Sequence, residues 1–101
     1  MAISEDVGAS RRRERFDPGR IVVTSEATEV LSWTVISAAV ERHTMGDWGE
    51  VWEERKQENE DALQGEGDRL FSIYRAGDSM KFCVVSDTRQ GVTTVMLADE
   101  V

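Results

Sequence analysis

The side chains with the widest chemical capacity in this chain are its single histidine, His43, and its single cysteine, Cys83. Together with Asp47 they could in principle supply a base, a nucleophile and an orienting carboxylate. Cys83 lies within an apolar run, however, where a buried and unreactive thiol is expected. One His and one Cys are also only half of a zinc ligand set. The sequence therefore favours a protein that is not an enzyme, with no catalytic residue, metal or cofactor, and leaves a small enzyme using His43 and Cys83 as a rival.

Carboxylates are concentrated in an acidic block at residues 47–68, DWGEVWEERKQENEDALQGEGD. The block holds nine carboxylates against only Arg55 and Lys56, a net charge of −7 out of −8 for the whole chain. Its acids do not follow the order of a calcium loop, and the glycines of GEGD lie between acids that would repel a phosphate. The block therefore predicts a negative surface, either solvated or bound to a basic partner.

Length and composition exclude several classes of protein. A chain of 101 residues with 40% hydrophobic residues allows one modest core. A pI near 4.6 argues against direct binding of nucleic acid or an anionic membrane by the body of the protein. A lone cysteine, no apolar run of about 18 residues and no signal-peptide pattern predict a soluble cytoplasmic protein.

The order of elements predicts an α+β domain of residues 20–101. We expect an edge strand over residues 21–23, a helix over 25–42, a Gly-punctuated loop over 43–49 and a second helix over 50–63. Three strands then follow over residues 69–75, 80–86 and 92–97, joined by short turn-forming linkers. The predicted fold is two helices packed on a three- to four-stranded antiparallel sheet, in the order β-α-α-β-β-β.

The first predicted helix is apolar around most of its circumference, which favours burial of Trp33 and Ile36 in the core or in a homodimer interface. In the second helix the acids share one face. At 100° per residue they fall within an arc of about 160°, and the members of that arc are Glu50, Glu53, Glu54, Glu58, Glu60 and Asp61. From Glu50 to Asp61 their spacing averages one charge per about 3 Å of axis, close to the ~3.4 Å of one DNA strand.

Two tryptophans, Trp48 and Trp52, flank this acidic face. Either could anchor the loop or helix on the core, or be an exposed contact residue, since Trp is enriched at interface hot spots. The candidate partner-binding set is Asp47, Trp48, Glu50, Trp52, Glu53, Glu54, Glu58 and Asp61. Residues 1–19, with Arg11, Arg12, Arg13 and Arg15, read as a flexible basic tail that could be a solvated terminus or could touch nucleic acid.

Three segments carry a resemblance to a known group of proteins: RHTMGDWGE at residues 42–50, NEDALQGEGDRLFSIY at 59–74 and VTTVMLADE at 92–100. From about Ile21 onward the chain resembles a group of small uncharacterised bacterial proteins carried on plasmids, integrative elements and prophages. The chain departs from that pattern in its first 19 residues and around Trp52. The resemblance implies a role on a mobile genetic element but no established activity.

These observations together predict a non-enzymatic inhibitor of a nucleic-acid-handling defence complex. By analogy of class with small acidic proteins of such elements, we expect an anti-CRISPR protein whose acidic helix face mimics DNA and binds a basic surface of a CRISPR effector or a similar complex. The alternative is a regulatory or antitoxin-like binding module of a plasmid or prophage, which would use the basic tail on DNA or the acidic face on a cognate protein.

Overall fold

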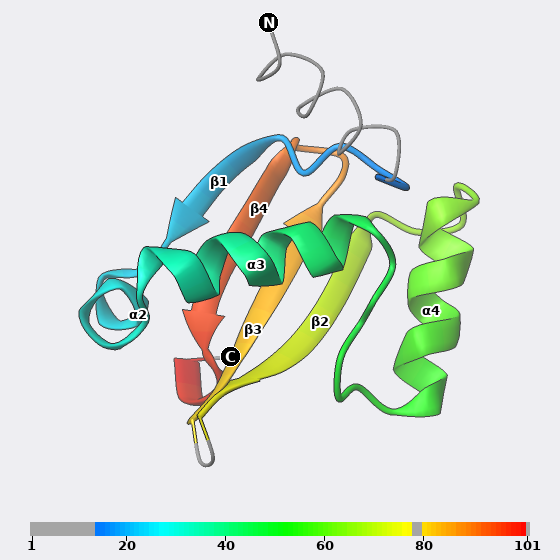
Figure 1. Cartoon of the computed structure of the whole chain (residues 1–101). Coiled ribbons are helices and arrows are strands. Elements are labelled where there is room, and N and C mark those ends of the chain that lie inside the picture. Colours follow the sequence, from blue (N-terminus) through cyan, green and yellow to red (C-terminus); the bar gives the residue numbers. More distant parts are fainter. Residues whose placement is uncertain (1–13, 78–79, 101) are drawn as a thin grey trace, which may run out of the picture.

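The computed structural model describes residues 14–77 and 80–100. Its strands are β1 (Arg20–Val23), β2 (Arg69–Ala76), β3 (Met80–Asp87) and β4 (Val92–Leu97), and its α-helices are α2 (Ser25–Val30), α3 (Trp33–Thr44) and α4 (Glu53–Leu63). A short 3-10 helix, η1 (Ala98–Glu100), follows β4. Figure 1 shows α3 lying across the sheet and α4 standing beside β2. The α+β class predicted from the sequence is confirmed.

The four strands form one sheet in the order β1-β4-β3-β2. β2, β3 and β4 make the antiparallel meander that the linkers predict. β1, however, runs parallel to β4, so the prediction of an antiparallel sheet was wrong for this strand. The reason is the connection: α2, α3 and α4 carry the chain from one end of the sheet back to the other, as a parallel crossover requires. β1 and β2 then share a direction, and two reversals return β4 to it.

The helix predicted over residues 25–42 is divided into α2 and α3 at Leu31 and Ser32. Leu31 is extended, with φ −108° and ψ 136°. The Ser32 side chain caps α3 by accepting a hydrogen bond from the Val35 amide at 3.2 Å. The break turns Leu31 into the core at 6% exposure and leaves Trp33 68% exposed. The predicted burial of Trp33 in the core of the single chain was therefore wrong, whereas that of Ile36 is confirmed at 2% exposure.

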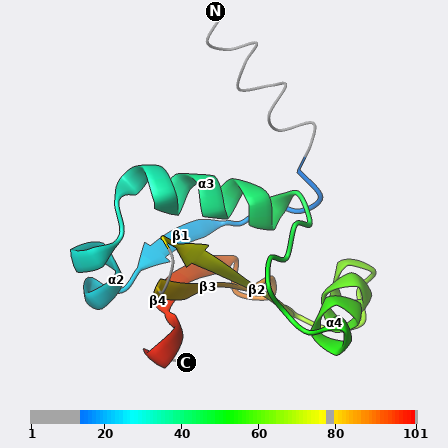
Figure 2. The ribbon, with the colours of Figure 1, turned by 60° about the horizontal axis from the view of Figure 1, so that its bottom comes forward.

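The main core lies between α2, α3 and one face of the sheet (Figure 2). Strand register places Leu70, Ser72 and Tyr74 on this face together with Phe82 and Val84. A second cluster packs α4 and the segment before it against β2, and its buried members are Trp48, Val51, Ala62 and Leu70.

The segment before β1 also packs on the fold. Phe16 stacks on Trp48 at 6.4 Å between ring centroids. The Arg15 amide donates to the Thr44 carbonyl at 2.7 Å, and the Pro18 carbonyl accepts from the Thr93 hydroxyl at 2.6 Å. The boundary predicted between residues 19 and 20 is thus too late, because these three residues belong to the packed domain. Arg11, Arg12 and Arg13 of the predicted tail lie outside the described residues.

Candidate partner-binding surface

The helix that carries most of the acidic block is α4, and few apolar contacts hold it. Only Asn59 and Ala62 of its residues are buried. The Asn59 side chain makes two hydrogen bonds to the backbone of Phe71 in β2: its amide nitrogen donates to the carbonyl at 2.8 Å, and its oxygen accepts from the amide at 3.0 Å. These bonds pair Asn59 with an edge strand and hold α4 beside the sheet. The sequence analysis did not single out Asn59.

α4 begins at Glu53, three residues after the predicted start at Glu50. The segment before it lies alongside β2 instead: the Glu50 amide donates to the Ile73 carbonyl at 2.8 Å, and the Ile73 amide donates to the Trp48 carbonyl at 3.2 Å. Gly49 lies between them with φ +74°, where a Cβ would collide with the Ile73 carbonyl oxygen. The predicted placement of Glu50 on the helical acidic face is therefore wrong.

Three carboxylates of the block form short ion pairs with arginines. Asp47 pairs with Arg42 at 2.8 Å, Glu50 with Arg75 at 2.9 Å, and Glu60 with Arg15 at 2.8 Å. In each case the hydrogen bond from the arginine is the largest cause that lowers the pKa of the carboxyl below its ordinary value. The structure thus gives Asp47, Glu50 and Glu60 local partners within the fold.

The remaining acids of α4 face solvent. Glu53, Glu54 and Glu58 are exposed, and Asp61 is half-buried and accepts a hydrogen bond from Gln57 at 3.0 Å. Within the described part of the chain, Glu53 and Glu58 have only long contacts with cations, 4.0 Å to Lys56 and 3.5 Å to Arg55. Glu54 has no ion pair among residues 14–77 and 80–100. Exposed pairs of this kind contribute little, so these carboxylates are available to a partner.

The two tryptophans have different environments. Trp48 is 5% exposed and its indole N–H donates to Glu60 at 3.1 Å, so it anchors the loop on the core. Trp52 is the N-cap residue of α4 and is 80% exposed. Its indole lies beside Glu54, Arg55 and Glu58. Of the two alternatives that the sequence left open, Trp48 is the anchor and Trp52 the exposed residue.

The structure separates the residues of the rival enzyme hypothesis. Strand register puts Cys83 opposite Ile73, on the sheet face opposite α2 and α3, whereas His43 bonds Ser72 and Ser86 on the face that α3 covers. Both residues are buried. Burial also raises the pKa of the Cys83 thiol, which makes it a poor nucleophile. His43 and Cys83 cannot act on one substrate in this fold.

His43 instead is the centre of a buried hydrogen-bond chain. Thr93 donates to the Pro18 carbonyl, so the contact of 2.6 Å between Ser86 and Thr93 requires Ser86 to donate. His43 Nε2 must then carry its proton toward Ser86 at 2.9 Å, and Nδ1 accepts from Ser72 at 2.6 Å. Burial lowers the pKa of His43 to about 4, which keeps the ring neutral at pH 7. The chain of bonds joins α3, three strands and the segment before β1.

Neither a metal site nor a membrane-spanning helix is present in the described part of the chain. Within it, no group of three or more His, Cys, Asp or Glu side chains is placed to hold a metal ion. No helix there has the length and apolar character needed to cross a bilayer.

No family model, curated protein or solved structure matches the chain. The resemblance to proteins of plasmids and prophages therefore stays a prediction.

Proposed function

We propose that this chain is a non-enzymatic binding protein that docks the exposed surface of α4 on a basic surface of a nucleic-acid-handling complex. The observation that carries the proposal is the contrast within the acidic block. Asp47, Glu50 and Glu60 are held in ion pairs, while Glu53, Glu54 and Glu58 extend into solvent next to the exposed indole of Trp52. A partner would meet carboxylates whose charge the fold leaves largely uncompensated.

The spacing of these charges supports mimicry of a nucleic-acid backbone. From Glu53 to Asp61 the helix rises about 12 Å at 1.5 Å per residue, so four carboxylates (Glu53, Glu54, Glu58 and Asp61) give about one charge per 3 Å of axis. One DNA strand carries one charge per ~3.4 Å. We infer that the protein is an inhibitor encoded by a mobile genetic element. It would occupy the DNA-binding channel of a defence complex, and a CRISPR effector is the favoured target.

Trp52 gives this surface a hydrophobic contact that a bare acidic helix lacks. An indole that is 80% exposed in the free protein can bury a large area on binding without disturbing the fold. Carboxylates around it would set orientation and the rate of association, while the indole would slow dissociation. We therefore assign Trp52 as the anchor of the interface.

The test is DNA binding by purified CRISPR effector complexes of several types, measured with increasing amounts of this protein at 50 and 200 mM salt. We expect the unaltered chain to displace DNA from at least one of them, more weakly at high salt. The triple variant with Glu53, Glu54 and Glu58 changed to Gln should lose this competition. The matched control changes Glu29→Gln, Glu41→Gln and Asp99→Asn, which removes the same charge from exposed positions on other elements.

Two results would overturn the proposal. Full competition by the triple variant would show that the α4 carboxylates are dispensable. Equal loss in the control variant would show that only overall charge matters. The Trp52→Ala variant separates the anchor from the charge: we expect it to weaken binding at least tenfold at both salt concentrations, with an unchanged circular dichroism spectrum.

A further inference from the structure

The edge of the sheet formed by β1 has backbone groups that the described chain does not pair. The amide of Arg20 donates to Gly91, just before β4, and the amide of Thr24 donates to Val95 in β4. In a parallel ladder the alternate residues bond the same neighbour, so Arg20, Val22 and Thr24 face β4. The N–H and C=O groups of Ile21 and Val23 therefore point outward, where no described segment pairs with them. Such an edge is a template for another strand.

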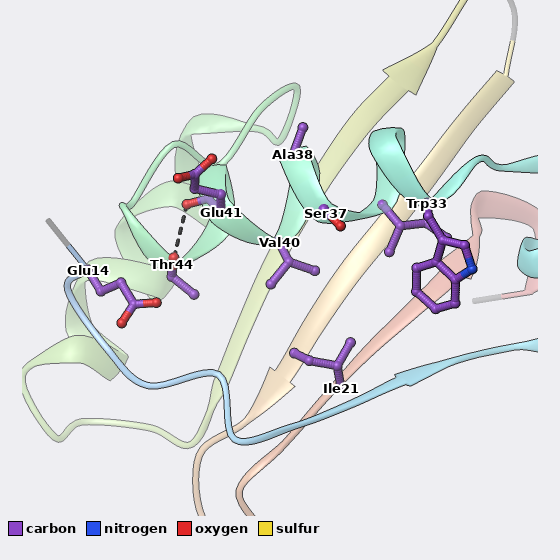
Figure 3. Close-up of a pocket in the computed structure, with 9 residues that line it drawn as sticks. Glu14, Ile21, Trp33, Ser37, Ala38, Val40, Glu41 and Thr44 are labelled. Carbon is purple, nitrogen blue, oxygen red and sulfur yellow. Dashed lines mark hydrogen bonds between the residues drawn. The ribbon is translucent and has the colours of Figure 1, made fainter. Parts of the chain in front are cut away.

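Exposed apolar side chains are concentrated near the same edge. Among the described residues six large hydrophobic side chains are exposed, and four of them, Ile21, Val22, Val30 and Trp33, lie on β1, α2 or the start of α3. An apolar groove of about 600 Å³ runs between β1 and α3, with Ile21, Ile36 and Val40 on its walls. Figure 3 shows Trp33 near one end of this groove and Glu14 and Glu41 near the other. The edge thus combines unpaired backbone with an apolar groove.

We propose that a second copy of this chain pairs with β1, so that two sheets join into one of eight strands in a symmetric dimer. The two β1 strands run antiparallel with Val22 opposite Val22 of the second copy. In this register Ile21 of each copy pairs with Val23 of the other, and all four outward-facing residues gain partners. Trp33 of each copy then covers the apolar groove beside the paired strands.

Charge favours a second copy as the occupant. β1 itself is an extended apolar strand whose one charged residue, Arg20, is basic. Among the described residues, the charged ones that line the groove are Glu14 and Glu41. The two-fold axis places the acidic ends of the two grooves at opposite ends of the paired β1 strands. α4 lies beside β2 at the far edge, so the two most acidic surfaces stay apart. The resulting dimer would present one α4 surface at each end.

The first test is sedimentation velocity of the full chain over a hundredfold range of concentration. We expect a monomer–dimer equilibrium that Trp33→Ser shifts at least tenfold toward monomer. Trp52→Ser is the matched control: it removes another exposed indole, located on α4, and should leave the equilibrium unchanged. Ile21→Pro should also give monomers, because it removes an outward N–H and spares the bonds to β4. Unchanged circular dichroism and thermal midpoint of both monomeric variants would show that they still fold.

The second test locates the two-fold axis. Opposed residues at a non-hydrogen-bonded antiparallel position have Cα atoms about 4.5 Å apart, within the range of a disulfide. In a Cys83→Ser background, Val22→Cys should form a covalent dimer on mild oxidation. Met80→Cys should not, although Met80 and Val22 are both 37% exposed. Equal cross-linking of the two variants would contradict the register.

Three outcomes would overturn the proposal. A full chain that stays monomeric at the highest concentration would show that the edge does not self-associate. A dimer that resists both Trp33→Ser and Ile21→Pro would use another surface. A monomeric full chain that dimerises only after removal of residues 1–13 would identify that segment as the occupant of the edge. None of these results depends on binding by α4, so the dimer and the proposed function are tested separately.

Discussion

The two outer strands of the sheet, β1 and β2, differ in how their free backbone groups are satisfied. At β2 the chain supplies the partners itself: Asn59 bonds both backbone groups of Phe71, and Trp48 and Glu50 bond those of Ile73. At β1 the outward groups of Ile21 and Val23 have apolar side chains around them and no partner in the described chain. An edge strand is a template for aggregation unless it is covered. One edge is thus closed by folding, and the other is suited to association.

Asn59→Ala should break the closed edge and have the largest effect on stability. It leaves the amide and carbonyl of Phe71 without partners and removes the main tie between α4 and β2. Each unsatisfied buried group costs about 1–3 kcal/mol, so we expect a loss of roughly 4 kcal/mol in the free energy of unfolding. Urea denaturation followed by circular dichroism measures this loss.

Gln57→Ala is the control for that measurement, because Gln57 lies on the same helix and its side chain bonds Asp61 at the surface. Its effect should stay below about 0.5 kcal/mol. If Asn59→Ala costs no more than Gln57→Ala, the β2 edge does not need its side-chain partner. The asymmetry between the two edges would then have no energetic basis.

Acidification should lower the free energy of unfolding by about 3 kcal/mol, through His43 in the core between the two edges. The pKa of His43 is about 4 in the folded protein and 6.5 ordinarily, so the unfolded chain binds more protons between these values. Stability therefore falls as pH drops from 6.5 toward 4 and is fully retained above 6.5. A shift of about 2.5 pH units corresponds to about 3 kcal/mol. Urea denaturation at pH 7 and pH 5 checks the sign before most carboxylates titrate.

His43→Gln provides the comparison for the acid effect. The variant should be less stable than the unaltered chain at pH 7, because Ser72 and Ser86 lose their partner in part. Its stability should also change much less between pH 7 and pH 5. An unchanged pH dependence in His43→Gln would assign the acid sensitivity to other groups.

Local sequence patterns predicted most of the fold but not the partners of its side chains. Alternation in residues 69–86 divides the strand residues between two faces without saying which face meets the helices, and short linkers identified the meander. The parallel pairing of β1 depends on where a long connection returns, which no local pattern encodes. The division at Leu31 had a signal in Ser32, a favourable N-cap residue within an apolar run. Apolar residues on both sides of Ser32 favour a continuous helix, so this signal alone did not predict the break.

The sequence predicted the acidic composition of the candidate site but not which of its carboxylates are exposed and which are held in ion pairs. A run of acids predicts a negative surface, but which carboxylates are neutralised depends on distant arginines: Arg15 and Arg75 lie 45 and 25 residues from Glu60 and Glu50. The two tryptophans are four residues apart and differ in exposure because Gly49 and Ile73 fix the chain between them. Small polar residues at inward strand positions, Ser72, Ser86 and Thr93, were the available signal for the hydrogen bonds of His43.

Arg15→Ala should have a smaller effect, and it sharpens the distinction between paired and exposed acids. Arg15 bonds Glu60 with two nitrogens at 2.8 and 3.0 Å, but both side chains are partly exposed. Ion pairs in such positions contribute up to about 1 kcal/mol. A double-mutant cycle with Glu60→Ala should therefore give a coupling free energy below that value and decreasing with salt. A coupling well above 1 kcal/mol would mean that Glu60 is a structural member of the fold rather than a surface acid.

The smallest effect on stability is expected at the acids assigned to binding. Glu54 and Glu58 are exposed and lie four residues apart on one face of α4, where like charges repel by a few tenths of a kcal/mol. Changing both to Gln should leave the free energy of unfolding within about 0.5 kcal/mol, because relief of this repulsion offsets the lost interaction of Glu54 with the N-terminal end of the helix dipole. Urea denaturation at low salt checks this. A loss of stability would show that these carboxylates support the helix. If stability is unchanged and the variant no longer competes with DNA for the effector, the exposed acids of α4 act in binding and not in folding. Asn59, on the same helix, would then have the opposite role, because it holds α4 against β2.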